Sequence, residues 1–131
     1  MLKDNSIYVA GHNGMVGSAI VRLLLKSGYN NIITKSSKDL DLTNQANVDI
    51  FFSKTKPDFV FIAAAKVGGI FANNHFRADF IYDNIMIQSN LINACKKHEV
   101  KKMVFLGSSC IYPRLSKQPI KENYLLSLIH I

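Results

Sequence analysis

The sequence predicts an α/β fold in which helices cover both faces of a doubly wound parallel sheet. Along the 131 residues, short apolar runs alternate with longer helix-like segments, which is the pattern of repeated strand–helix–strand units. Residues 59–63 form a continuous apolar run, typical of a strand that is covered on both faces. Gly11, Gly14 and Gly17 directly follow the first apolar run, at the point where a strand would turn into a helix.

The first part of the chain predicts two strands with a helix between them. Residues 7–10 form an apolar strand, and residues 15–27 carry apolar side chains at helical spacing. Gly28 then occupies the C′ position at which helices commonly end. Residues 31–34 follow as a short second strand.

The remainder predicts two helices and two strands. Thr43 can cap a helix over residues 44–55 that ends before Pro57. A long helix occupies much of residues 76–98, and residues 103–107 form the fourth strand. The core face expected for the long helix comprises Phe80, Ile81, Ile85, Ile87, Leu91 and Ile92. In the doubly wound order the first and fourth strands would be neighbours, so we expect ligands beyond the carboxyl ends of these two strands.

The glycine-spaced turn predicts a binding site for the pyrophosphate of a nucleotide cofactor. Gly11 permits the tight turn, Gly14 lets the backbone approach a phosphate, and Gly17 lets the helix pack close to the strand. The start of the helix presents free N–H groups and the positive end of its dipole to the anion. The candidate phosphate-binding residues are Gly11, His12, Asn13, Gly14, Met15, Val16 and Gly17.

The segment after the second strand favours NADP(H) over NAD. NAD-preferring sites usually carry an acidic residue about 20 residues past the glycines. Here lysines and serines come first, and they suit a 2′-phosphate; alternatively, the segment is a polar loop that happens to be basic. Asp41 is expected beside the adenine, where its carboxylate would accept a hydrogen bond from the exocyclic amine. The candidate cofactor residues here are Lys35, Ser37, Lys38, Asp39, Leu40, Asp41 and Leu42.

The ends of the third and fourth strands supply further candidates. Ala63, Ala64 and Ala65 have small side chains that let the backbone approach the cofactor, although ordinary packing at a strand end explains them equally well. The fourth strand leads into the candidates Leu106, Gly107, Ser108, Ser109 and Cys110. From the residues alone, Ser108 is a hydroxyl that can simply cap a turn, and Cys110 is more simply an inert buried thiol.

Composition and charge argue against several other classes of protein. The chain is 48% hydrophobic and 19% charged, has no apolar stretch long enough to span a bilayer and begins without a secretory h-region, so we expect a cytoplasmic protein with no membrane partner. The net charge of +7 is not accompanied by a nucleic-acid-binding motif, so no nucleic acid is expected. The histidines are scattered and the cysteines lack C-x-x-C spacing, so no metal site is expected.

Longer motifs give the chain a resemblance to a known family. They lie at residues 10–12, 14–20, 63–70, 79–82 and 106–113. With these motifs, residues 6–124 resemble the GDP-L-fucose synthases of the extended short-chain dehydrogenase/reductase superfamily. The resemblance implies a Rossmann domain that binds NADP(H), a substrate GDP-4-keto-6-deoxy-D-mannose that is epimerised at C3 and C5 and then reduced at C4, and a homodimer for the full-length proteins. It also implies that Ser108 orients the ketone and that Cys110 is an acid/base group in the epimerisations.

The chain also departs from that family. The family commonly has arginines at the positions of Asn13 and Ser37, which leaves Lys35 and Lys38 as the expected 2′-phosphate ligands. None of the five tyrosines has a lysine four residues later, so the Tyr-x-x-x-Lys motif that protonates the substrate oxygen is missing.

We therefore expect residues 1–124 to be a partial NADP-binding Rossmann domain, incomplete after the fourth strand, followed by an apolar tail over 125–131 and no substrate domain. Truncation, an interrupted reading frame or a split gene would each explain this ending. The chain by itself is expected to be inactive. The alternatives are a non-catalytic NADP-binding module and another sugar-nucleotide epimerase or dehydratase, against which the AAKVGGI sequence argues.

Overall fold

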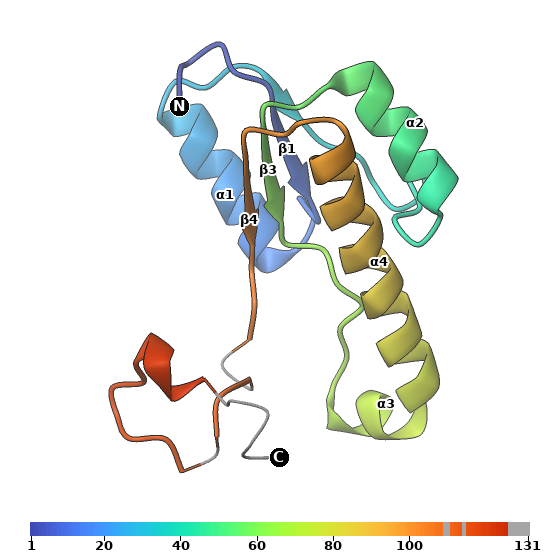
Figure 1. Cartoon of the computed structure of the whole chain (residues 1–131), viewed down its shortest axis with the longest axis vertical. Coiled ribbons are helices and arrows are strands. Elements are labelled where there is room, and N and C mark those ends of the chain that lie inside the picture. The colour runs from blue at the N-terminus through green and yellow to red at the C-terminus, as the bar shows by residue number, and fades with distance from the viewer. Residues whose placement is uncertain (109–110, 114, 126–131) are drawn as a thin grey trace.

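The computed structural model describes residues 1–108, 111–113 and 115–125, which form a parallel sheet flanked by helices (Figure 1). The strands are β1 (Ile7–Ala10), β2 (Ile32–Ile33), β3 (Phe59–Ile62) and β4 (Lys102–Phe105). The helices are α1 (Met15–Lys26), α2 (Gln45–Thr55), α3 (Ile70–His75), α4 (Arg77–Lys97) and the short 3₁₀ helix η2 (Glu122–Tyr124). The predicted doubly wound α/β fold is confirmed. None of the helices in the described ranges is long and apolar enough to cross a membrane.

The order of the strands in the sheet is β2-β1-β3-β4, so the expectation that the first and fourth strands are neighbours is wrong. β1 pairs with β3 along its whole length, from Ile7 opposite Phe59 to Ala10 opposite Ile62. The segment between β2 and α2 contains no strand, so the sheet grows by only one strand beyond β1 on that side. The next strand, β3, is placed on the other side of β1, and the switch point lies between β1 and β3.

Helices cover both faces of the sheet (Figure 1). Successive residues of β1 belong to two different core clusters, one on each face. Ile7 and Val9 pack with Leu24 of α1. Tyr8 and Ala10 pack on the other face with residues of α2 and α4, among them the fully buried Phe52. This double coverage explains why β1 and β3 consist entirely of apolar residues.

The N-terminus of α2 is capped by Asn44, whose side-chain oxygen accepts a hydrogen bond from the Asn47 N–H at 3.1 Å. The sequence predicted Thr43 as the cap, which is one residue before the observed cap. The Thr43 hydroxyl and N–H both bind the carboxylate of Asp41 instead, at 2.8 and 2.9 Å. Thr43 is therefore fixed to the preceding loop, and the helix begins after Asn44.

The face of α4 that packs on the sheet differs from the expected one. Leu91 is buried and Ile87 is partly buried as predicted, but Ile81, Ile85 and Ile92 are exposed to solvent. The remaining buried positions of α4 are Asn90, Ala94 and Cys95. Apolar residues occupy two stripes of this helix, so helical periodicity alone does not tell which of them faces the sheet. The short helix α3, which precedes α4, was not predicted.

Candidate functional site

A cavity of about 610 Å³ lies beyond the carboxyl ends of β1 and β3. This volume lies within the usual range for small-molecule sites, and the position is that of the switch point. Four segments form its walls: the loop after β1, the segment after β2, the residues after β3 and one face of α4. The lining residues are Gly11, His12, Asn13, Gly14, Met15, Val16, Lys35, Ser36, Ser37, Leu40, Asp41, Leu42, Thr43, Ala63, Ala64, Ala65, Lys66, Val67, Asp83 and Ile87.

Two of the three glycines in the loop after β1 are required by the fold itself. Gly11 has a φ of +81°, and a Cβ atom there would lie 2.5 Å from the carbonyl oxygen of Ala63. A Cβ atom at Gly17 would overlap the carbonyl oxygen of Gly11. Gly14 has an ordinary φ of −75°, and the nearest non-adjacent atom to its Cβ position in the described part of the chain is the Gly11 oxygen, at 3.3 Å. Of the three glycines, Gly14 is the one that packing within the chain requires least. It is also the one that lies both at the start of α1 and in the cavity wall.

The glycine loop presents polar groups that suit an anionic ligand. α1 begins at Met15 in the cavity wall with no side-chain cap and no acidic residue in its first turn, so its first N–H groups are available to a phosphate. His12 also lines the cavity, and within the described residues its buried Nδ1 atom has no hydrogen-bond partner. A buried polar atom without a partner is rare and is consistent with a ligand that completes the site.

The segment after β2 places some, but not all, of the predicted residues in the cavity. Lys35, Ser36 and Ser37 line it, whereas Lys38 and Asp39 do not. The N–H groups of Asp39 and Leu40 both donate to the Ser36 carbonyl, which closes a tight turn and leaves Lys38 and Asp39 exposed. The Ser36 hydroxyl donates to Asp39 at 2.6 Å, and this bond is the main reason that the pKa of Asp39 is lowered.

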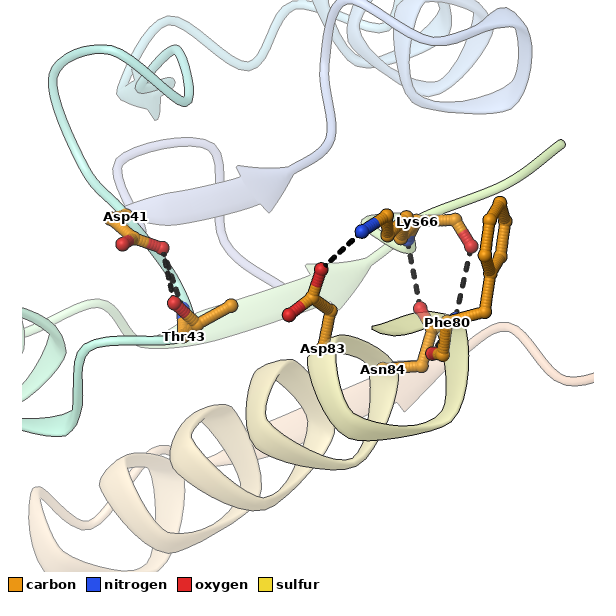
Figure 2. Close-up of polar contacts among 6 residues, drawn as sticks. All are labelled: Asp41, Thr43, Lys66, Phe80, Asp83 and Asn84. Atoms are coloured by element: carbon orange, nitrogen blue, oxygen red, sulfur yellow. Dashed lines mark hydrogen bonds and ion pairs between the residues drawn. The ribbon is translucent and has the colours of Figure 1, made fainter. Parts of the chain in front are cut away.

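Asp41 lies in the cavity wall with a fixed orientation (Figure 2). Its Oδ1 atom accepts hydrogen bonds from both the N–H and the hydroxyl of Thr43. Such a turn leaves the second carboxylate oxygen for another donor. Leu40, which follows the turn, is 6% exposed and belongs to the core as well as to the wall.

Beyond β3, the cavity wall is bound to α4 (Figure 2). Ala63, Ala64 and Ala65 all line the cavity, and the Ala63 N–H donates to the Ala10 carbonyl at 3.0 Å. Lys66 forms an ion pair with Asp83, with 2.6 Å between Nζ and Oδ2, and this carboxylate is the main reason that the pKa of Lys66 is raised. The α4 residues in the wall, Asp83 and Ile87, were not predicted, although their spacing of four places them on one face of a helix.

The other predicted site residues lie elsewhere. Gly17 is buried in α1 against the glycine loop. Leu106, Gly107 and Ser108 follow β4, which β3 separates from β1, and they do not line the cavity. Ser109 and Cys110 lie outside the described residues. Six residues of the cavity wall were not predicted as site residues from the sequence: Ser36, Thr43, Lys66, Val67, Asp83 and Ile87.

Known proteins resemble this chain over almost its whole length. The model of the NAD dependent epimerase/dehydratase family matches residues 7–128. GDP-L-fucose synthase 1 of Arabidopsis thaliana is 56% identical over 125 residues, which are 95% of this chain and 39% of that protein. GDP-L-fucose synthase of Escherichia coli is 51% identical over 125 residues, again 95% of this chain and 39% of that protein. The chain thus spans about two fifths of the length of these relatives.

Solved structures share the fold of the chain. A GDP-D-glycero-L-gluco-heptose synthase from Campylobacter jejuni, studied in the presence of NADPH, is 47% identical with a TM-score of 0.90; the match covers 95% of this chain and 36% of that one. A GDP-L-fucose synthetase from Naegleria fowleri bound to NADP is 32% identical with a TM-score of 0.83, covering 95% and 40%.

Proposed function

The chain belongs to the NAD dependent epimerase/dehydratase family, and we propose that it is the cofactor-binding part of a GDP-L-fucose synthase. The observation that carries this proposal is the cavity at the switch point, where a glycine loop, the start of α1 and a basic segment meet. Two relatives with this name are 51% and 56% identical to the chain, which supports the same nucleotide-sugar chemistry.

The cofactor of this site is proposed to be NADP(H). Its pyrophosphate would be held by the backbone from Gly11 to Val16, and its 2′-phosphate by Lys35, Ser36 and Ser37. The orphaned His12 Nδ1 and the glycine cradle fit such a group. Two related structures, from Campylobacter jejuni and Naegleria fowleri, were determined with NADPH or NADP. When bound, the cofactor supplies the hydride that reduces a C4 ketone.

The proposed substrate is GDP-4-keto-6-deoxy-D-mannose, epimerised at C3 and C5 before the reduction. The catalytic roles proposed for Ser108 and Cys110 rest on the family resemblance, because Ser108 lies outside the cavity and Cys110 outside the described residues. No tyrosine among the described residues lines the cavity, and no Tyr-x-x-x-Lys occurs in the 131 residues. We therefore propose that these residues alone bind the cofactor without turning over the keto-sugar, which is how a non-catalytic binding module behaves.

We also propose that the chain is cytoplasmic and pairs with a second copy. Ile81, Ile85 and Ile92 form an exposed apolar stripe on α4, at 62%, 47% and 45% exposure, and such a stripe favours association with another apolar surface.

A titration with NADPH tests the cofactor proposal. Gly14→Leu is expected to weaken binding at least about tenfold, because a bulky side chain at the start of α1 blocks the approach of a phosphate to the backbone. Gly69→Leu is a matched control, since Gly69 also precedes a helix with an ordinary φ of −69° and lies outside the cavity wall. Equal NADPH affinity of both variants and the unmutated chain would refute the phosphate-loop role of Gly14.

A further inference from the structure

Two asparagines of α4 hold two different walls of the cavity. Asn84 pairs with the backbone of Lys66 at two points: its Oδ1 accepts from the Lys66 N–H at 2.8 Å, and its Nδ2 donates to the Lys66 carbonyl at 3.0 Å (Figure 2). The neighbouring Asp83 binds the Lys66 side chain. Both polar groups of the Lys66 backbone, and its ammonium group, are therefore bound to one turn of α4.

Asn90 plays the corresponding part at the opposite wall. It is 5% exposed, and its Nδ2 group donates to the carbonyl oxygens of Leu42 and Thr43 at 2.9 and 3.0 Å. These two carbonyls belong to the segment that contains Asp41 and leads into α2. A buried amide that is bound in this way is costly to remove, because the two carbonyls would lose their partner.

The order of the strands assigns the two walls to different halves of a dinucleotide. The cavity extends from the segment after β2, past the glycine loop after β1, to the residues after β3. With the pyrophosphate at the glycine loop, the wall held by Asn90 is on the β2 side, with Lys35 and Asp41, where the adenosine 2′-phosphate half would lie. The wall held by Asn84 is on the β3 side, where the nicotinamide half would lie.

We propose that Asn84 and Asn90 are positioning residues that fix the two halves of the dinucleotide site separately, Asn84 for the nicotinamide half and Asn90 for the adenosine half. This inference rests on the proposed function. Neither residue is in the cavity wall itself; each acts through the backbone that it binds. Ile87, between them on α4, completes the wall of the cavity.

Two ligands separate these roles from a general effect on folding. NADPH occupies both halves of the proposed site, whereas adenosine 2′,5′-bisphosphate occupies only the adenosine half. Asn84→Ala is expected to weaken NADPH about tenfold and to change the Kd of the bisphosphate less than about twofold. Asn90→Ala is expected to weaken both ligands by about tenfold. Asn93→Ala, at an exposed position of the same helix, is the control and should change neither.

The nearly isosteric Asn84→Asp variant guards against misfolding of the alanine variant. It keeps the acceptor for the Lys66 N–H but sets a carboxylate oxygen against the Lys66 carbonyl in place of the donor, so the same selective loss of NADPH affinity is expected. Thermal melts of the ligand-free variants by circular dichroism establish that each one is folded.

Equal weakening of both ligands by Asn84→Ala and Asn84→Asp, or an Asn90→Ala variant that keeps its affinity for the bisphosphate, would overturn the division of the site. Unchanged NADPH affinity in the Asn84 and Asn90 variants would overturn the positioning roles and leave the proposed function intact. An unmutated chain that binds neither ligand would refute the proposed function, and with it both roles.

Discussion

Substitution of Gly11 by alanine tests the link between the glycine loop and the wall after β3. Gly11 has a φ of +81°, and this left-handed conformation costs a non-glycine residue about 1–2 kcal/mol. In addition, the new Cβ atom would lie 2.5 Å from the Ala63 oxygen and 2.7 Å from the Ala64 nitrogen, where ordinary contacts need more than 3 Å. Relief of such an overlap in a packed region costs about 1–3 kcal/mol more. The expected loss is thus about 2–5 kcal/mol in the free energy of unfolding.

Gly28→Ala supplies the control for this substitution. Gly28 has nearly the same φ, +82°, but among the described residues, its two chain neighbours aside, no atom lies within 4 Å of its Cβ position. It should therefore lose only the conformational part, about 1–2 kcal/mol. The difference between the two variants, about 1–3 kcal/mol, isolates the contact with the backbone of Ala63 and Ala64.

Urea unfolding at equilibrium measures both losses, and NADPH titration reports the effect on the site. Gly11→Ala should weaken NADPH strongly, because Ala63 and Ala64 must move and both line the cavity; Gly28→Ala should leave the affinity unchanged. Equal destabilisation by the two substitutions would show that the close contact of Gly11 with Ala63 and Ala64 is not needed for stability. A Gly11→Ala variant that binds NADPH as tightly as the unmutated chain would show that this contact is not needed for the site.

Three further predictions concern other parts of the chain. The carboxylate of Asp58 binds the Lys101 ammonium group at 2.7 Å and the Ser6 N–H at 2.9 Å, and chiefly the bond to Lys101 lowers the pKa of Asp58. The ionised carboxylate therefore stabilises the fold above about pH 4, and this stabilisation is lost as the pH falls. Urea unfolding should show Asp58→Asn to be less stable than the unmutated chain at neutral pH, with a difference that shrinks at about pH 2–3. Burial raises the pKa of the Cys95 thiol to about 11, so iodoacetamide at about pH 8 should alkylate it only in urea, as detected by mass spectrometry of its peptide; rapid labelling of the folded chain would contradict this burial. Ile85→Glu should reduce the self-association that light scattering detects while leaving the melting temperature nearly unchanged, and an unaltered molar mass would argue against the α4 stripe as a contact surface.

Local patterns predicted the parts of the fold that local interactions determine. The predicted helix over residues 15–27 is observed at Met15–Lys26, and the apolar run over 59–63 contains β3 at Phe59–Ile62. The glycine spacing likewise located the loop after β1 in the cavity wall, because a tight turn and a close backbone contact leave few alternatives to glycine.

Long-range contacts account for what the sequence did not predict. Asn90 appears as a polar residue on α4, and only its bonds to the carbonyls of Leu42 and Thr43, 48 and 47 residues away, explain its burial. Ile85 and Ile92 have the periodicity of core residues, but the sheet occupies the opposite stripe of the helix. Which strand pairs with β1 on its other side depends on how many strands the chain forms before the switch point. The short segment after β2 does not indicate this number.

The most direct test of the proposed site is an NMR titration of the ¹⁵N-labelled 131-residue chain with NADPH. Saturable binding is predicted to shift the amide signals from Gly11 to Val16 and those of Ala64 to Lys66 most strongly, because these backbone groups form the cavity walls at the switch point. Amides at the amino ends of β1 and β3, such as those of Ser6 and Asp58, lie at the opposite end of the strands and should shift little. No saturable change, or changes concentrated outside the walls of the cavity, would contradict the assignment of this cavity to a dinucleotide.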